Sequence, residues 1–160
     1  MGFFLAQTKY SAEKFSLPPN GVGGGSIFCQ TTILRNGIQP DGAIRNKKNG
    51  KTIYVEIKRQ DGWVEGKPRS AGRGNAHERL CKYFTPGLLT KLRDTGNIDS
   101  QHLPFWIVFQ GDITRDPCRV REIKYWFGEY QANYFFWRDT KNADALIDHF
   151  KNHIYPILEN

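Results

Sequence analysis

The sequence predicts an α/β (α+β) fold, with a central mixed β-sheet flanked by helices. Two runs at 41–46 and 52–60 are separated by turn-forming residues, which is typical of paired strands. The run 105–109, Phe-Trp-Ile-Val-Phe, has the length and composition of a buried strand. Apolar residues near the C-terminus follow the spacing of an amphipathic helix: Leu146, Ile147, Phe150 and Ile154. Strands mixed with helices at these lengths favour a layered sheet-and-helix domain.

Further elements are expected along the chain. In order, they are an amphipathic segment at 9–16, a strand at 27–34, a glycine-rich basic loop at 61–74, a helix from about Asn75 that is broken before Pro86, and a helical stretch to Asp94. The loop 20–26 lacks the Gly-Lys-Ser/Thr ending of a phosphate-binding loop. No nucleotide cofactor is therefore expected.

The length and composition fit one globular domain, 1–160. Aromatic residues make up 14% of the chain, which excludes a disordered tail. No apolar run approaches about 18 residues, so no membrane span is expected. The three cysteines have no metal-ligand spacing and are interpreted as reduced thiols in a cytoplasmic protein.

The charge balance indicates a polyanionic partner. Lysine and arginine total 23 against 16 acidic residues, giving a net charge of +7. Basic domains gain affinity for nucleic acid because each neutralised phosphate releases counterions. A basic protein without such a partner is the alternative.

The strand 52–58 alternates apolar and polar residues, so that Glu56 and Lys58 project from one face. Asn49-Gly50 is a strong signal for a two-residue type I′ hairpin loop. This register predicts that Lys58 lies opposite Asp41. Asp41 and Glu56 then become diagonal neighbours with α-carbons about 7–8 Å apart.

Two carboxylates at that separation can share one Mg²⁺, which uses one or two protein carboxylates and keeps several waters. Lys58 adds a positive charge beside them. The alternative is a surface strand with an ordinary ion pair. A second Glu-x-Lys, at Glu122, lacks an upstream Pro-Asp and looks helical, so replacing Glu122 is expected to have little effect.

Pro40-Asp41 followed by Glu56-Ile57-Lys58 resembles the signature of PD-(D/E)XK nucleases. The resemblance implies that Asp41 and Glu56 bind the metal, with the Ile57 carbonyl as a further ligand. It also implies that Lys58 assists the attacking water. Many such nucleases use another acid on an N-terminal helix, for which Glu13 is the early candidate.

A second motif follows the hairpin: Gly74-Asn75-Ala76-His77-Glu78-Arg79. It resembles the Gly-Asn-Ala-x-Glu-Arg motif of the EcoRI/MunI branch of type II restriction endonucleases, which reads the adenines of a central AATT. Asparagine can bond bidentately to adenine, and arginine is a common donor to purine acceptors. The alternative is a helix start, with Asn75 as N-cap and Glu78 closing a capping box. The resemblance covers about residues 38–111.

The segment between the motifs carries basic residues suited to the DNA backbone: Lys67, Arg69 and Arg73. A flexible solvated loop is the alternative. His149 and His153 lie four apart on the C-terminal helix, where a solvated helix face is favoured over a metal pair.

These features together predict a Mg²⁺-dependent type II restriction endonuclease. The expected substrate is double-stranded DNA with a short palindromic site containing AATT, cut to leave 5′-phosphates. A palindromic site implies a homodimer. The short chain leaves a bare four-base site open beside a six-base site. The alternatives are a Holliday-junction resolvase or repair nuclease of the same fold, and a catalytically silent DNA-binding module.

Overall fold

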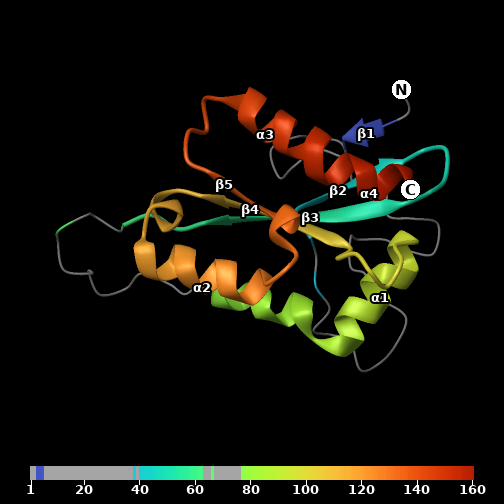
Figure 1. The fold of residues 1–160 in the computed structure, drawn as a ribbon, viewed down its shortest axis with the longest axis horizontal. Helices are drawn as coiled ribbons and strands as arrows, with labels where there is room; N and C mark the ends of the chain where they lie inside the picture. The colour runs from blue at the N-terminus through green and yellow to red at the C-terminus, as the bar shows by residue number, and fades with distance from the viewer. Residues whose placement is uncertain (1–2, 6–37, 39, 63–65, 67–76) are drawn as a thin grey trace.

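A five-stranded mixed sheet forms the centre of the computed structural model, with the strands in sequence order (Figure 1). The model describes residues 3–5, 38, 40–62, 66 and 77–160. The strands are β1 (Phe3–Leu5), β2 (Gly42–Asn46), β3 (Thr52–Arg59), β4 (Phe105–Gln110) and β5 (Tyr134–Trp137). β1, β2 and β3 pair antiparallel, whereas β3, β4 and β5 pair parallel. The predicted fold class is confirmed; β1 and β5 were not predicted, and the elements expected at 9–16 and 27–34 lie outside the described residues.

The register of the β2–β3 hairpin differs from the predicted one by two residues. Ala43 pairs with Tyr54, and the Asn46 amide donates to the Lys51 carbonyl at 2.8 Å, so residues 47–50 form the loop. The type I′ turn is wrong as well, because Gly50 has a φ of 76° but Asn49 is not among the positive-φ residues. The residues that lie opposite Asp41 and Glu56 on the neighbouring strand therefore differ from the predicted ones.

The C-terminal helix explains this longer loop. The side-chain amides of Asn46 and Asn49 both donate to the Leu158 carbonyl, each at 2.9 Å. Both residues are thus held by a partner more than 100 positions away in the chain. A two-residue turn formed by local preference would not place both amides on that carbonyl.

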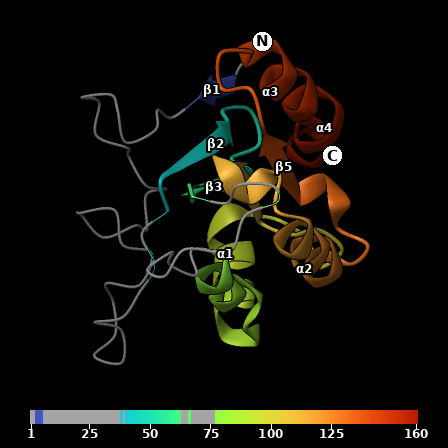
Figure 2. The same ribbon diagram turned by 90° about the vertical axis from the view of Figure 1, so that its left-hand side faces the viewer.

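Helices cover both faces of the sheet. They are η1 (Glu78–Phe84, a 3-10 helix), α1 (Pro86–Gly96), the 3-10 turns η2 (Asp112–Thr114) and η3 (Gln131–Asn133), α2 (Pro117–Phe127), α3 (Ala143–His149), the π-helical η4 (Phe150–Ile154) and α4 (Tyr155–Glu159). α1 and α2 lie on one side of the sheet, and α3 and α4 lie on the other (Figures 1 and 2). The predicted helix to Asp94 and the amphipathic C-terminal helix are confirmed, although Ile147 is exposed.

Two apolar clusters fill the space between these layers. Tyr54 is fully buried among residues of α1 and α2, such as Leu92 and Phe127. It lies on the face of β3 that the alternating sequence pattern predicts to be polar. Ile53 and Trp106 pack on the other face with the C-terminal helices. β3 is therefore a central strand covered on both sides, so the interpretation of Glu56 and Lys58 as an exposed surface pair is wrong.

Helix α2 begins at a strong local signal. The Asp116 carboxylate accepts from the Cys118 and Arg119 amides at 3.0 and 3.4 Å, and Pro117 occupies the first turn. The second Glu-x-Lys lies inside this helix, as predicted. Within the described part of the chain, no helix is long and apolar enough to cross a membrane, and Cys81 and Cys118 are free thiols.

Candidate active site

The observed register places Asp41 next to Glu56 more directly than the predicted one. Gly42 pairs with Val55, so one further step along the ladder puts Asp41 opposite Glu56. Directly opposed residues have β-carbons about 4.5–5.5 Å apart. The Ile57 amide donates to Asp41 Oδ2 at 2.8 Å, which fixes the Asp41 side chain against β3.

Among the described residues, the Glu56 carboxylate has two hydrogen-bond partners. Its Oε1 accepts an ion-paired hydrogen bond from Lys58 Nζ, and its Oε2 accepts from the Tyr83 hydroxyl at 3.0 Å. Only 10% of the Glu56 side chain and 15% of the Lys58 side chain are exposed. A carboxylate this buried needs such donors, because desolvation otherwise disfavours its charge.

Tyr83 is the site residue that sequence reasoning missed. It lies in η1, is 1% exposed and packs edge-on against Phe105 with ring centroids 5.2 Å apart. Burial raises its pKa, and the negative charges of Glu56 and Asp41 raise it further. Both carboxylates therefore lie close enough to Tyr83 to act on its hydroxyl, while no feature of the local sequence distinguishes this tyrosine from the other six.

The donor set suits a hard divalent cation. Asp41 and Glu56 supply carboxylate oxygens, and Ile57 supplies a backbone carbonyl between Glu56 and Lys58. Among the described positions, no three or more His, Cys, Asp or Glu residues form a group that could hold a metal ion. Mg²⁺ requires fewer protein ligands because it keeps several waters.

The recognition motif is described only from its fourth residue onward. Glu78 and Arg79 are exposed at the start of η1, so both side chains are accessible to a ligand. Gly74, Asn75 and Ala76 lie outside the described residues, as do Lys67, Arg69, Arg73 and Glu13. The predicted cap by Asn75 is therefore not described, and the helix from Glu78 is a 3-10 helix with no side-chain cap at His77.

His77, the variable position of that motif, is fully buried against α2. Its Nε2 lies 3.0 Å from Glu122 Oε2, and its ring stacks on Trp126 at 5.4 Å and 11°. Arg119 Nη1 also donates to Glu122 Oε2, at 2.7 Å. Burial lowers the pKa of His77, with Arg119 adding to the effect, so the ring is neutral near pH 7. Glu122 of the second Glu-x-Lys thus contacts His77, the fourth residue of the 74–79 motif.

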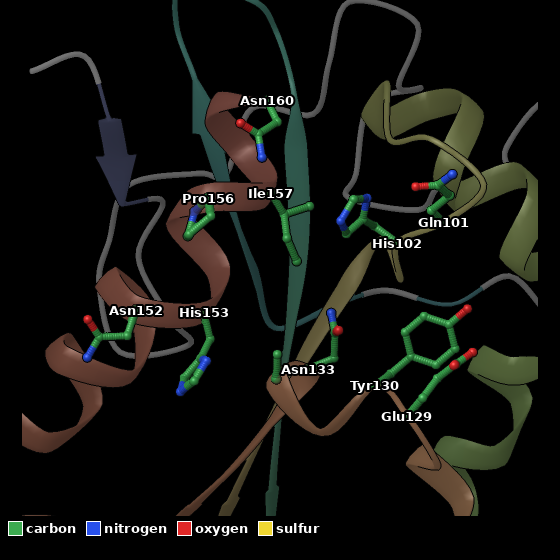
Figure 3. A pocket seen from close by; sticks show the side chains of 11 residues that line it. Gln101, His102, Glu129, Tyr130, Asn133, Asn152, His153, Pro156, Ile157 and Asn160 are labelled. Carbon is green, nitrogen blue, oxygen red and sulfur yellow. The ribbon is translucent and has the colours of Figure 1, made fainter.

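A pocket of about 620 Å³ lies at the amino-terminal ends of β4 and β5 (Figure 3). It is lined by His102, Tyr130, Asn133, His153 and α4 residues, and by none of those predicted site residues that the structure describes. The pocket therefore stands apart from the site on β2 and β3.

His149 is not on a solvated face as expected, because its ring stacks on Trp106 with ring centroids 5.6 Å apart.

A mixed sheet with helices on both faces, with an aspartate just before β2 and a glutamate and a lysine on β3, defines the class of PD-(D/E)XK nucleases. The chain belongs to the family described as type II restriction enzyme MunI, whose profile matches residues 16–159. It is 57% identical over 124 residues to the type II restriction enzyme MunI of Mycoplasma sp, covering 77% of this chain and 61% of that protein. It is also similar to the crystal structure of MunI restriction endonuclease in complex with cognate DNA, with a TM-score of 0.71 and 56% identity. This match covers 77% of this chain and 63% of the crystallised one, so the chain spans less than two thirds of either relative.

Proposed function

We propose that this protein is a Mg²⁺-dependent type II restriction endonuclease that cuts double-stranded DNA at a short palindromic site containing AATT. Two contacts support the proposal: the Ile57 amide donates to Asp41, and Lys58 pairs with Glu56, the residue before Ile57. Its membership of the MunI family supports the reaction class. The proposal takes 1–160 as one nuclease domain that acts in the cytoplasm.

Each residue of the cluster has a distinct role in the proposed chemistry. The Ile57 amide holds Asp41, and Tyr83 and Lys58 hold Glu56, so the two carboxylates and the Ile57 carbonyl form the metal-binding group. Bound Mg²⁺ would lower the pKa of a coordinated water and neutralise charge on the phosphate.

The Lys58 ammonium, which pairs with Glu56, would orient the water and stabilise negative charge that develops on phosphorus oxygens. The water oxygen bonds to phosphorus as the bond to the 3′-oxygen breaks. The attacking water gives up one proton to solvent, the 3′-oxygen takes one proton from solvent, and the phosphate stays on the 5′ end.

Reading of the sequence is assigned to the 74–79 motif, in which Asn75 can donate to and accept from an adenine edge and Arg79 can only donate, to purine acceptors. Glu78 and Arg79 are exposed, which base contacts require. The structural neighbour is a MunI complex with cognate DNA, which supports duplex DNA as the ligand. Lys67, Arg69 and Arg73 are proposed to bind phosphates, and a homodimer would present one motif to each half-site.

Digestion of DNA of known sequence with Mg²⁺, followed by sequencing of every end, tests the proposal. We expect all ends to fall at sites containing AATT and to carry 5′-phosphates, and the same data distinguish a four-base from a six-base site. Preferential cleavage of branched DNA would instead support a resolvase. Binding without cleavage in any divalent ion would support a silent DNA-binding module.

A further inference from the structure

Tyr83 joins two parts of the molecule that the proposed function treats separately. Its hydroxyl donates to Glu56 Oε2 at 3.0 Å, across 27 positions of sequence. Its backbone belongs to η1, the continuous 3-10 helix from Glu78 to Phe84 that also carries Arg79. One helix thus carries both the exposed end of the recognition motif and a donor to the candidate metal ligand.

Packing around Tyr83 restricts the movement of its side chain. The side chain is 1% exposed, and its ring lies edge-on to Phe105 at 5.2 Å and 61°. Phe105 in turn lies against Phe84 and Phe127, so the ring sits in a closed aromatic cluster between η1, α2 and the sheet. A side chain so enclosed transmits a shift of its helix to the atom it contacts.

The bond also limits how the Glu56 carboxylate can turn. Oε2 accepts from Tyr83, while Oε1 faces Lys58 from the same strand. Without the hydroxyl, Oε2 would have no donor from η1, and the carboxylate would lose one of its two fixed contacts. A ligand held in several orientations binds a metal more weakly than one held in a single orientation.

We infer that Tyr83 is a positioning residue, which fixes Glu56 for Mg²⁺ and links metal binding to the helix that reads DNA. The link to DNA reading rests on the proposed function, whereas the effect on Mg²⁺ is open to measurement without DNA. By reciprocity, a helix held by a cognate site strengthens the metal site, and a metal-loaded site strengthens the hold on DNA.

The test compares Tyr83→Phe with Tyr54→Phe, each in the full chain. Tyr54 is a matched control: it lies on the same strand as Glu56, is 0% exposed, and its hydroxyl has no hydrogen-bond partner among the described residues. Both variants remove a buried hydroxyl and keep the ring. The melting temperature is measured without DNA in rising MgCl₂, because a ligand that binds the folded state stabilises it.

We expect the wild type and Tyr54→Phe to respond to the same Mg²⁺ concentration, and Tyr83→Phe to need roughly three- to tenfold more. Cleavage by Tyr83→Phe should be slow at limiting Mg²⁺ and recover at high Mg²⁺, with duplex affinity in EDTA unchanged. An unchanged Mg²⁺ midpoint in Tyr83→Phe, an equal shift in Tyr54→Phe, or a wild type that Mg²⁺ does not stabilise would each overturn the inference. A wild type that Mg²⁺ stabilises but that cuts no DNA would refute the proposed function alone, and the melting series would still judge the role of Tyr83.

Discussion

The imidazole of His77 is within hydrogen-bonding distance of the Glu122 carboxylate, with 3.0 Å between Nε2 and Oε2, and its ring stacks on Trp126. Forty-five positions separate the two residues in sequence. The contact fixes the chain immediately before Glu78 and Arg79, the exposed end of the proposed recognition motif. Glu122 lies outside the proposed metal site, and its contact with His77 gives it a structural role beside the proposed recognition motif.

Replacement of Glu122 should therefore have a measurable effect, contrary to the expectation from sequence. Glu122→Ala leaves His77 and Arg119 without their shared acceptor, and we expect the free energy of unfolding to fall by about 1–3 kcal/mol. Preference for AATT over sites with one changed base should fall with it. Glu129→Ala, which removes an exposed carboxylate just beyond the same helix, is the control and should change stability by less than about 0.5 kcal/mol. Equal specificity in both variants would show that the His77 contact does not support recognition.

The acid–acid–lysine cluster should carry the chemistry. Asp41→Ala, Glu56→Gln and Lys58→Ala should each lower the rate of DNA cleavage at least about a hundredfold, because each removes charge that stabilises the transition state. Binding of duplex DNA in EDTA and the circular dichroism spectrum should be retained. Asp148→Ala, at an exposed position on α3, is the control. Wild-type cleavage by Glu56→Gln would place the metal ligand elsewhere.

Substitutions in the recognition motif should act on sequence preference. Each good bidentate base contact contributes about 1–3 kcal/mol of discrimination. Asn75→Ala or Arg79→Ala should thus cost roughly tenfold to a hundredfold per half-site in cleavage of the cognate sequence. Replacing Lys67 and Arg69 should instead weaken cognate and unrelated duplexes alike and reduce the salt dependence of binding. A loss confined to the cognate site in that double variant would show that these lysine and arginine side chains read bases.

Stability should fall in acid through His149. Burial, followed by the charge of the neighbouring His153, lowers the pKa of His149 from 6.5 to about 4. Below pH 6.5 the unfolded chain takes up a proton at this imidazole that the folded chain does not, so stability is lost as the pH falls from 6.5 to about 4. His149→Phe keeps a ring against Trp106 and removes the titration. Melting temperatures from pH 4 to 8 should fall less steeply in this variant, and identical slopes would show that His149 is accessible to protons in the folded state.

Two glycines of α1 offer a matched test of packing against the sheet. A β-carbon at Gly96 would lie 2.5 Å from the Thr52 carbonyl oxygen, whereas one at Gly87 meets nothing within 4 Å. Gly96→Ala should destabilise the fold by about 1–3 kcal/mol because helix and strand must separate. Gly87→Ala should be neutral or stabilising by up to about 1 kcal/mol, since alanine favours the helix. Chemical denaturation of both variants measures the difference, and equal stabilities would mean that α1 moves away from β3 at no cost.

The sequence by itself determined the features that depend on neighbouring residues. Alternating apolar and polar residues marked β3, and a continuous apolar run marked β4. Helix α2 begins at Asp116-Pro117 because the Asp116 side chain caps it and the Pro117 ring suits its first turn. The spacing of Asp41, Glu56 and Lys58 was readable for the same reason, because two strands and one turn bring them together.

The tertiary structure decided what depends on partners far along the chain. The Leu158 carbonyl sets the hairpin loop through Asn46 and Asn49, which changes the residue opposite Asp41. Helices cover the polar face of β3, and Tyr83 and His77 acquire their roles only by contacting Glu56 and Glu122. A hydrogen bond across 27 to 112 positions leaves no periodicity in the local sequence, since either partner alone is an ordinary polar side chain in its own segment.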